Sequence, residues 1–286
     1  MKTIRISAFT AVFILLSFTA YGQKKIFSDP YFFVQISDPQ FGMNEADKGF
    51  GLETYKYDKA VKAVNRLKPD FVVITGDLVN NKDSASQITE FKRLTSMINK
   101  NIKVWYVPGN HDIGQPPTKI DIDKFIANYG HDRFAFKHKE STFIGLNSCI
   151  IKSDNPGEEE IQMKWLRTEL DNSATSNHII VFTHYPFFIN TPDEPETYSN
   201  ISIAKRNTYF TIFNEKGVDA VFAGHLHNNG AGKSGNVEMI TTNAVAKSNG
   251  KGPSGIRVIK VYPDRIESVF YGIDEIPGIV TFAEKK

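Results

Sequence analysis

Side chains that can bind metal ions follow five apolar segments of this chain. The first residues of these groups are Asp38, Asp77, Asn110, His184 and His225, and His227 follows the last of them. Taken singly, each could be only a turn residue, a helix cap or a structural histidine. Taken together, carboxylate, imidazole and amide donors suit first-row metals such as manganese, iron or zinc. A carboxylate can bridge two ions through its two oxygens, and Asp77 is the candidate bridge.

A centre of two metal ions suits the hydrolysis of phosphoesters. Two cations about 3.5–4 Å apart can hold phosphate oxygens and lower the pKa of a bound water, so that a hydroxide attacks phosphorus. An imidazolium nearby can then protonate the leaving group. His111 is the candidate for that role because it directly follows Asn110, and Asp112 could orient its ring.

The segments that must position these residues alternate between strands and helices. Strands are predicted for five apolar, β-branched runs: 32–36, 71–75, 103–107, 178–182 and 219–223. Helical spacing of apolar residues predicts four helices: 54–67, 84–98, 158–170 and 203–214. Ligands of open α/β sheets bind beyond the carboxyl ends of the strands, so five such ends could meet at one site. The last part, about 236–271, is expected to be all β.

The composition is that of one large globular domain. The chain has 286 residues, of which 41% are hydrophobic and 23% are charged. No linker, low-complexity segment or repeat divides it, so residues 23–286 are expected to form a single domain with a β-rich end. The single cysteine, Cys149, excludes an internal disulfide, and its apolar surroundings predict a buried strand residue.

Residues 1–22 have the pattern of a signal peptide. Lys2 and Arg5 precede an apolar run over about residues 6–18, and the small residues Ala20 and Gly22 follow. The run is short for a membrane span. We therefore expect export to the periplasm or the exterior, without stable membrane association after cleavage. An uncleaved anchor is the alternative.

The charge of the predicted mature chain is balanced. Lys2 and Arg5 are two of the 34 basic residues, and none of the 32 acidic residues lies within 1–22, so the formal charge falls from +2 to 0. This balance gives no basic surface for nucleic acid. The acidic loop around residues 193–196 could border the site and would disfavour long polyanions. The expected partner is a phosphorylated small molecule or protein.

Five short motifs together resemble the calcineurin-like metallophosphoesterase superfamily in order and spacing, over about residues 30–245. They are Asp38-x-Gln40, Gly76-Asp77, Gly109-Asn110-His111-Asp112, His184 and Gly224-His225-x-His227. The longer stretches 38–42, 76–80 and 184–188 are similar to the subgroup around calcineurin-like phosphoesterase domain-containing protein 1, which is associated with serine/threonine phosphatase activity. The resemblance implies an α/β fold, a four-layer α-β-β-α sandwich with two mixed β-sheets.

The resemblance also implies two sets of ligands. The first metal ion would be held by Asp38, Gln40, Asp77 and His227, and the second by Asp77, Asn110, His184 and His225. His111 would contact the substrate phosphate together with Asn110 and assist the leaving group.

Gln40 is the departure from the superfamily pattern, which has His at this position. Its amide oxygen is a weaker and harder donor than imidazole, so magnesium or calcium become candidates at the first site beside manganese. The expected activity is hydrolysis of phosphomonoesters, with phosphoproteins among the candidate substrates. A phosphodiesterase or nucleotide pyrophosphatase would use the same centre. A metal-binding surface module without catalysis is a third alternative, which only Gln40 supports.

Overall fold

The computed structural model describes residues 29–153, 155–250 and 252–282. The predicted signal peptide, residues 1–22, lies outside these ranges, so export stays a prediction. Among the described residues, no helix combines the length and the apolar character that a membrane crossing requires.

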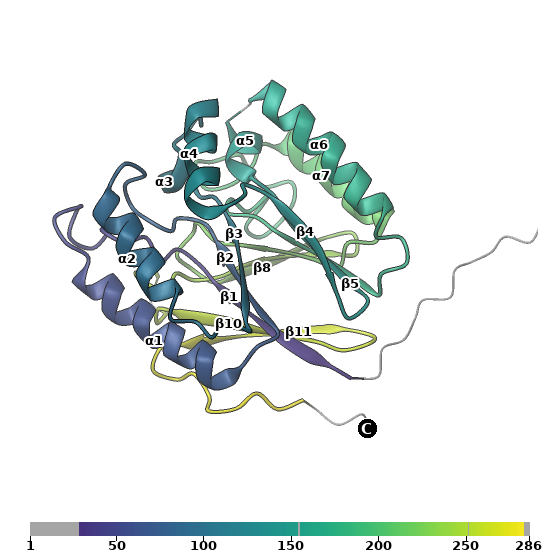
Figure 1. The fold of residues 1–286 in the computed structure, drawn as a ribbon. Helices are drawn as coiled ribbons and strands as arrows, with labels where there is room; N and C mark the ends of the chain where they lie inside the picture. Colours follow the sequence, from purple (N-terminus) through teal and green to yellow (C-terminus); the bar gives the residue numbers. More distant parts are fainter. Residues whose placement is uncertain (1–28, 154, 251, 283–286) are drawn as a thin grey trace, which may run out of the picture.

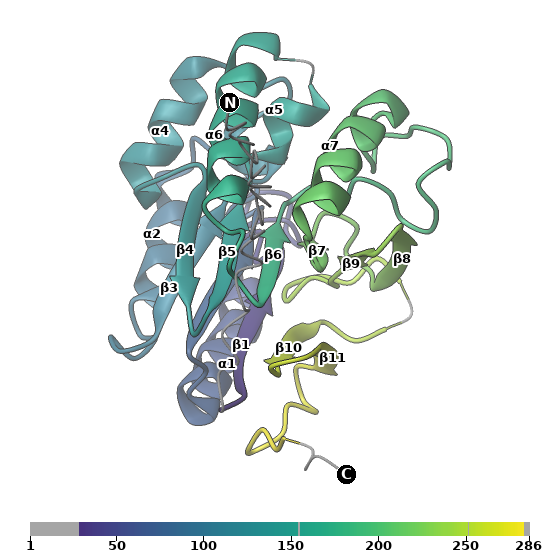
Figure 2. The same cartoon turned by 90° about the vertical axis from the view of Figure 1, so that its right-hand side faces the viewer.

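Two mixed β-sheets pack face to face (Figures 1 and 2). The first has the strand order β11-β10-β1-β2-β3 and consists of β1 (Tyr31–Ile36), β2 (Phe71–Thr75), β3 (Lys103–Val107), β10 (Gly255–Val261) and β11 (Ile266–Gly272). The second has the order β4-β5-β6-β7-β9-β8 and consists of β4 (Phe134–His138), β5 (Ser141–Gly145), β6 (His178–Phe182), β7 (Ala220–Ala223), β8 (Gly230–Ser234) and β9 (Val237–Thr241). Each sheet contains parallel and antiparallel pairs.

Helices cover the outer faces of both sheets. The described helices are α1 (Gly51–Leu67), α2 (Ala85–Thr95), α3 (Asn110–Ile113), α4 (Lys119–Tyr129), α5 (Ser148–Lys152), α6 (Pro156–Asp171) and α7 (Ile203–Lys216). Figure 1 shows α1 and α2 on one outer side and α6 and α7 on the other. The predicted four-layer α-β-β-α sandwich is confirmed.

Aromatic side chains fill the space between the sheets. Phe33 stacks on Phe71 at 4.7 Å between ring centroids and meets the edges of Phe143, Phe182 and Phe222 from the second sheet. Successive side chains of a strand point to opposite faces, so the neighbours of Phe33 pack under the helices instead. Both faces of β1 are buried, which explains why its sequence is a continuous apolar run.

The carboxyl ends of the parallel strands meet at one edge of the sandwich. Strands β1, β2 and β3 run parallel, as do β5, β6, β7 and β9. The imidazole Nδ1 of His184, after β6, lies 2.9 Å from the carbonyl oxygen of Thr75 at the end of β2. The predicted strand ends from both sheets therefore come together.

The structure corrects several predicted elements. In the predicted helix 158–170, the apolar Ile161 is 58% exposed, and the polar Gln162 is buried instead, where it hydrogen-bonds the backbone of Asn147. Cys149 is buried as predicted, but it lies in helix α5 and not in a strand. The segment 236–271 contains β9, β10 and β11, of which β9 joins the second sheet while β10 and β11 join the first.

Candidate metal centre

Five of the seven predicted metal ligands form two adjoining clusters. Asp77, His184 and His225 make one cluster, and Asp38, Asp77 and His227 make the other. The potential ligand atoms within each cluster lie within 4.8 Å of one another. Asp77 belongs to both, which is the geometry that a bridging carboxylate requires.

The side chain of His184 lies at the middle of the first cluster. Its Nε2 lies 3.5 Å from Oδ2 of Asp77 and 3.2 Å from Nδ1 of His225. The same nitrogen lies 3.0 Å from Oδ1 of Asn110, which brings the sixth predicted ligand to the site. In the second cluster, Nε2 of His227 lies 3.5 Å from Oδ1 of Asp38.

Two of the histidines are oriented by backbone carbonyls. Nδ1 of His184 lies 2.9 Å from the oxygen of Thr75, and Nδ1 of His227 lies 2.6 Å from the oxygen of Lys247. A carbonyl oxygen only accepts hydrogen bonds, so Nδ1 donates in both rings and Nε2 is the nitrogen available to a metal ion once the ring is neutral. Such contacts fix the ligating nitrogen of metal-binding histidines.

Within the described part of the chain, Gln40 carries the one buried ligand atom of the predicted set that has no hydrogen-bond partner. Its Oε1 is buried and unpartnered among the described residues, while its Nε2 donates to Oδ1 of Asn80 over 3.3 Å. Its backbone N–H donates to the carbonyl of Asp77 over 2.7 Å, which ties this loop to the bridging residue. A buried amide oxygen without a donor is costly, and a cation would satisfy it.

The backbone at the site is unusual. Five of the predicted ligands have positive φ: Asp38 (49°), Gln40 (35°), Asp77 (46°), His225 (70°) and His227 (49°). Residues other than glycine rarely adopt this left-handed conformation, and such strain concentrates at functional sites. The motif glycines are needed for close approach: a Cβ on Gly109 would overlap the backbone N and the carboxylate of Asp77.

His111 reaches the site through both its backbone and its ring. Its N–H donates to Oδ1 of Asp77 over 2.9 Å, and its Nδ1 lies 2.8 Å from the carbonyl oxygen of Asn80. The carbonyl holds the proton on Nδ1, so proton exchange with a substrate would use Nε2. Asn80 thus contacts both His111 and Gln40. The sequence reasoning gave it no role, because an asparagine in a loop carries no distinctive signal.

The prediction that Asp112 orients the His111 ring is wrong. The Asp112 carboxylate instead accepts hydrogen bonds from the backbone N–H groups of Gly109 (2.8 Å), Leu78 (2.9 Å) and Val79 (3.2 Å). Asp112 sits in the first turn of the short helix α3, with its side chain turned back to the helix start. It therefore joins the loop after β2 to the loop after β3.

Burial and neighbouring charges shift the pKa values of His225 and His227 in opposite directions. Burial and the neighbouring imidazole of His184 lower the pKa of His225 to about 2. Burial also disfavours charge on His227, but the adjacent Asp38 carboxylate outweighs it and raises the pKa of His227 to about 9. Burial and the nearby Asp77 raise the pKa of Asp112 well above its usual range. Only neutral imidazole ligates metal, so a cation beside Asp38 would take the place of the proton on His227.

A buried chain of hydrogen bonds leads to Asp38 from Arg257 in β10 of the first sheet. Its donors run in one direction, from Arg257 through Thr242, Gln35, Thr75 and Ser37 to the Asp38 carboxylate. The lengths of the first four links are 2.7, 2.6, 3.0 and 3.0 Å, and Ser37 then donates to Oδ2 of Asp38. All six side chains are at most 7% exposed. We call this series the Arg257–Asp38 chain.

Two tyrosines lie against the first cluster. The ring of Tyr185 is fully buried, with its centroid 4.1 Å from that of His225. Tyr198 is 62% exposed, its ring lies 5.2 Å from His225, and its hydroxyl lies 3.4 Å from Nδ2 of Asn110. Tyr198 was not predicted from the sequence, since it lies 14 residues after His184 in a loop without periodicity.

The loop that carries Tyr198 is held by buried polar contacts. Arg206 is fully buried and donates to the carbonyl oxygens of Ile201 (2.6 Å) and Pro192 (3.1 Å). Glu194, part of the predicted acidic border, accepts from the backbone N–H of Ile189 and of two following residues. Its carboxylate therefore stabilises the loop itself.

Comparisons with known proteins agree with this arrangement. A family model described as calcineurin-like phosphoesterase matches residues 33–229. The rat (Rattus norvegicus) serine/threonine-protein phosphatase CPPED1 is 32% identical over 273 residues, which cover 89% of this chain and 88% of the rat protein.

Solved structures share the fold at low sequence identity. A dimetal phosphatase from Danio rerio has a TM-score of 0.63 at 15% identity and covers 86% of this chain and 98% of its own. The purple acid phosphatase PPD1 from yellow lupin (Lupinus luteus) has a TM-score of 0.62 at 11% identity, over 87% of this chain and 52% of its own. At these sequence identities the similarity shows only a shared fold.

Proposed function

The chain belongs to the calcineurin-like phosphoesterase family, and on this premise we propose that it hydrolyses phosphomonoesters, phosphoproteins among them, at a two-metal centre. The family and the similarity to serine/threonine-protein phosphatases make it a hydrolase that acts on phosphoesters. The observation that carries the finer proposal is the pair of ligand clusters that share Asp77.

The residues present fit a pair of metal ions. We assign Asp38, Gln40, Asp77 and His227 to one ion, and Asp77, Asn110, His184 and His225 to the other. The unpartnered Oε1 of Gln40 and the two histidines with Nδ1 held by carbonyls support this assignment. Bound cations would supply charge neutralisation for the phosphate oxygens and activation of the attacking water.

The protein groups around that centre have separate tasks. His111 moves a proton through Nε2 toward the leaving oxygen, while Nδ1 stays on the carbonyl of Asn80. Asn110 is the candidate substrate contact beside it, since it begins α3 and its Oδ1 lies 3.0 Å from Nε2 of His184. Asp112 keeps the two loops in register through three backbone amides.

The donor atoms at each site support a proposal for the identity of the metals. The imidazole-rich cluster of His184 and His225 suits manganese, iron or zinc. At the Gln40 site, one imidazole and three oxygen donors make manganese, magnesium or calcium stronger candidates.

The test is metal-dependent release of p-nitrophenol from p-nitrophenyl phosphate. Asp77→Asn and His111→Gln should each lower kcat by about 10²-fold or more, since one removes the shared ligand and the other the proton donor. His138→Gln is a matched control, because His138 lies at the opposite edge of the second sheet and pairs with Asp70. Unchanged turnover in both site variants would overturn the mechanism.

Two further measurements separate the alternatives. Comparing p-nitrophenyl phosphate with bis-p-nitrophenyl phosphate distinguishes a monoesterase from a phosphodiesterase, and faster turnover of the diester would contradict our proposal. Metal content by mass spectrometry tests the centre itself. Fewer than two ions per chain and no turnover with any of several metals would favour a non-catalytic binding module.

We also propose that the protein is exported by residues 1–22. The support is the sequence pattern of two basic residues, an apolar run and small residues. Terminal sequencing of protein recovered from the periplasm or the medium of a bacterial host should give a start near Gln23. A cytosolic chain that keeps Met1 would contradict export.

A further inference from the structure

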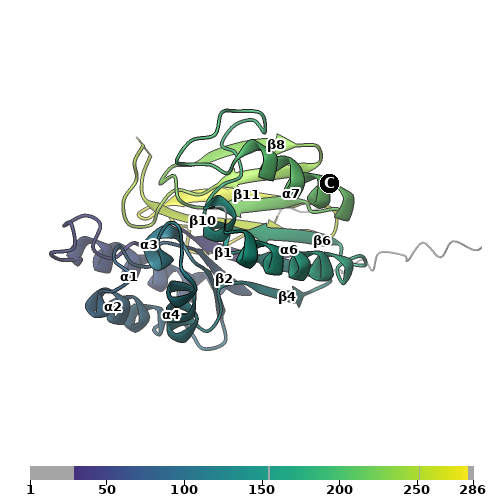
Figure 3. The same cartoon turned by 90° about the horizontal axis from the view of Figure 1, so that it is seen from above.

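A groove of about 650 Å³ lies between the two sheets, on the side away from β3 and β4. Its walls are the edge strands β8 and β11 with their neighbours β9 and β10. Figure 3 shows β8, β10 and β11 on the same side of the molecule. The opposite side of the sandwich is closed by stacked rings, with Trp105 on Phe136 at 4.5 Å. The β8–β11 side therefore differs from the β3–β4 side, because space remains between the two sheets there.

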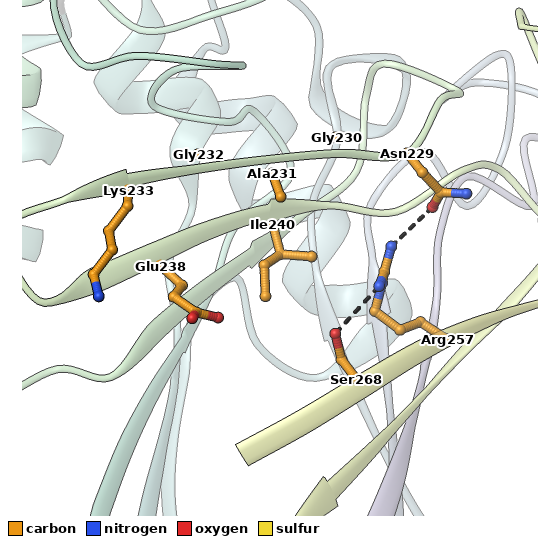
Figure 4. Close-up of a pocket in the computed structure, with 9 residues that line it drawn as sticks. All are labelled: Asn229, Gly230, Ala231, Gly232, Lys233, Glu238, Ile240, Arg257 and Ser268. Carbon is orange, nitrogen blue, oxygen red and sulfur yellow. Dashed lines mark hydrogen bonds between the residues drawn. The ribbon is translucent and has the colours of Figure 1, made fainter. Parts of the chain in front are cut away.

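Arg257 is the buried polar residue at one end of this groove (Figure 4). It is 7% exposed, and all four of its hydrogen bonds go to neutral oxygens: Oγ1 of Thr242 (2.7 Å), Oδ1 of Asn229 (2.9 Å), Oγ of Ser268 (3.2 Å) and the carbonyl of Thr241 (3.2 Å). A guanidinium has five N–H groups, so one N–H on Nη1 has no partner within the described part of the chain.

The positive charge of Arg257 has only a cation–π contact within the described part of the chain, with the guanidinium carbon 6.0 Å from the centroid of the Phe270 ring. Among the described residues, no carboxylate forms an ion pair with it, and burial lowers its pKa to about 10. Buried charges are ordinarily paired, because removing an ion from water costs several kcal/mol. The groove also contains Lys233 and Glu238, but these two lie opposite each other in the β8–β9 register and at the far end from Arg257 (Figure 4). Arg257 thus leaves an excess positive charge at its own end.

We propose that this groove binds a small oxyanion of the phosphate, sulfate or carboxylate kind, with the Arg257 guanidinium as its anchor. The free N–H on Nη1 donates to the anion, and the Ser268 hydroxyl beside it supplies a second donor. Charge-assisted hydrogen bonds of this type are short and about twice as strong as neutral ones. The volume is within the range of ligand pockets, so the anion can belong to a larger molecule.

This site is separate from the metal centre. Arg257 reaches Asp38 only through the four intervening side chains of the Arg257–Asp38 chain. The proposal therefore does not depend on the proposed phosphatase activity, and it is tested on metal-free protein so that anions held by metal ions do not contribute.

The experiment is a sulfate titration of chelator-treated full-length protein, followed by thermal unfolding, with chloride at matched ionic strength as reference. We expect a saturable rise of the unfolding midpoint with sulfate. Arg257→Gln should weaken sulfate binding by about tenfold or more, because it removes a charged donor. His111→Gln, a change at the other site, should bind sulfate as the parent does. A parallel titration with acetate tells whether carboxylates share the site.

Two further arms keep the test decisive if Arg257→Gln does not fold. Ser268→Ala removes a single hydroxyl donor, on the partly exposed strand β11, and should weaken sulfate binding by a few-fold. Crystals soaked in selenate should show an anomalous peak within hydrogen-bond distance of the Arg257 guanidinium. Equal midpoints in sulfate and chloride, or selenate found only at the metal centre, would overturn the proposal.

Discussion

Replacing Thr242 by valine should break the Arg257–Asp38 chain at its second member. Valine has nearly the shape of threonine but neither donates nor accepts hydrogen bonds. Oε1 of Gln35 would lose the hydroxyl that donates to it over 2.6 Å, and Nε of Arg257 would lose the oxygen that accepts from it over 2.7 Å. Neither atom has another partner within the described part of the chain.

The size of the effect follows from these two orphaned groups. A buried polar group without a partner costs about 1–3 kcal/mol, and more when it is charged. The structure around the two unpaired groups should relax in part and so reduce the sum of the two penalties. We therefore expect the free energy of unfolding to fall by about 2–4 kcal/mol. This is a large fraction of the total for a domain that is stable by roughly 5–15 kcal/mol.

Thr241 provides a matched control in the adjacent position. Its Oγ1 is buried but has no hydrogen-bond partner among the described residues, so Thr241→Val removes an unsatisfied group and not a bond. We expect its free energy of unfolding to stay within about 0.5 kcal/mol of the parent or to rise. Urea denaturation of both variants measures the difference in the free energy of unfolding, provided that the slope of this free energy against urea concentration is unchanged. Equal losses in the two variants would refute the hydrogen-bond argument.

A second readout separates stability from the positioning of Asp38. Mutating a side chain that supports a metal ligand typically changes the metal affinity by about 10–100-fold. Thr242 supports Asp38 only indirectly, through Gln35, Thr75 and Ser37. We therefore expect Thr242→Val to weaken metal binding at the Asp38 site by up to about tenfold, measured by titration of the chelated protein with Mn²⁺. A destabilised variant with unchanged affinity would show that the chain stabilises the sheet without positioning Asp38.

Three further predictions concern the site. Gly109→Ala should abolish metal binding and turnover, because the new Cβ overlaps the backbone N and carboxylate of Asp77; normal metal content by mass spectrometry would contradict this. Gln40→His should raise the zinc content of protein purified without added metal, since imidazole is the softer donor, and unaltered content would count against the Gln40 assignment. Tyr198→Ala should raise KM for p-nitrophenyl phosphate about two- to tenfold at constant metal content, as expected for one lost aromatic contact. Tyr55→Ala, on the exposed face of α1, is its control, and equal KM in the two would exclude a substrate contact by Tyr198.

The strands and the family were predictable because their signals are local. Continuous apolar runs such as Phe71–Thr75 mark strands buried on both faces, and the polar residues that follow them mark the edge where ligands bind. The sequence therefore predicted that Asp77, His184 and His225 would converge, and the structure brings them together. Their binding of metal stays a prediction.

The parts that were missed depend on contacts between distant segments. Asp112 follows His111 in sequence, but its carboxylate turns to the amides of Gly109, Leu78 and Val79, because three backbone donors converge on it there. Helix α4 is the exception, because its start is marked by a local capping box between Thr118 and Asp121.

Strain and buried charge explain why the site depends on this framework. Five predicted ligands adopt left-handed backbone, at about 1–3 kcal/mol each, so their sum approaches the stability of a whole domain. Such loops persist only where the surroundings determine them. The amides on Asp112, the carbonyl of Thr75 on His184 and the Arg257–Asp38 chain supply this restraint from the two sheets. Ligation of metal by the same residues would add to it. We therefore expect sheet packing and metal affinity to be coupled, because the contacts that hold the loops in strained conformations also set the spacing of the predicted ligands.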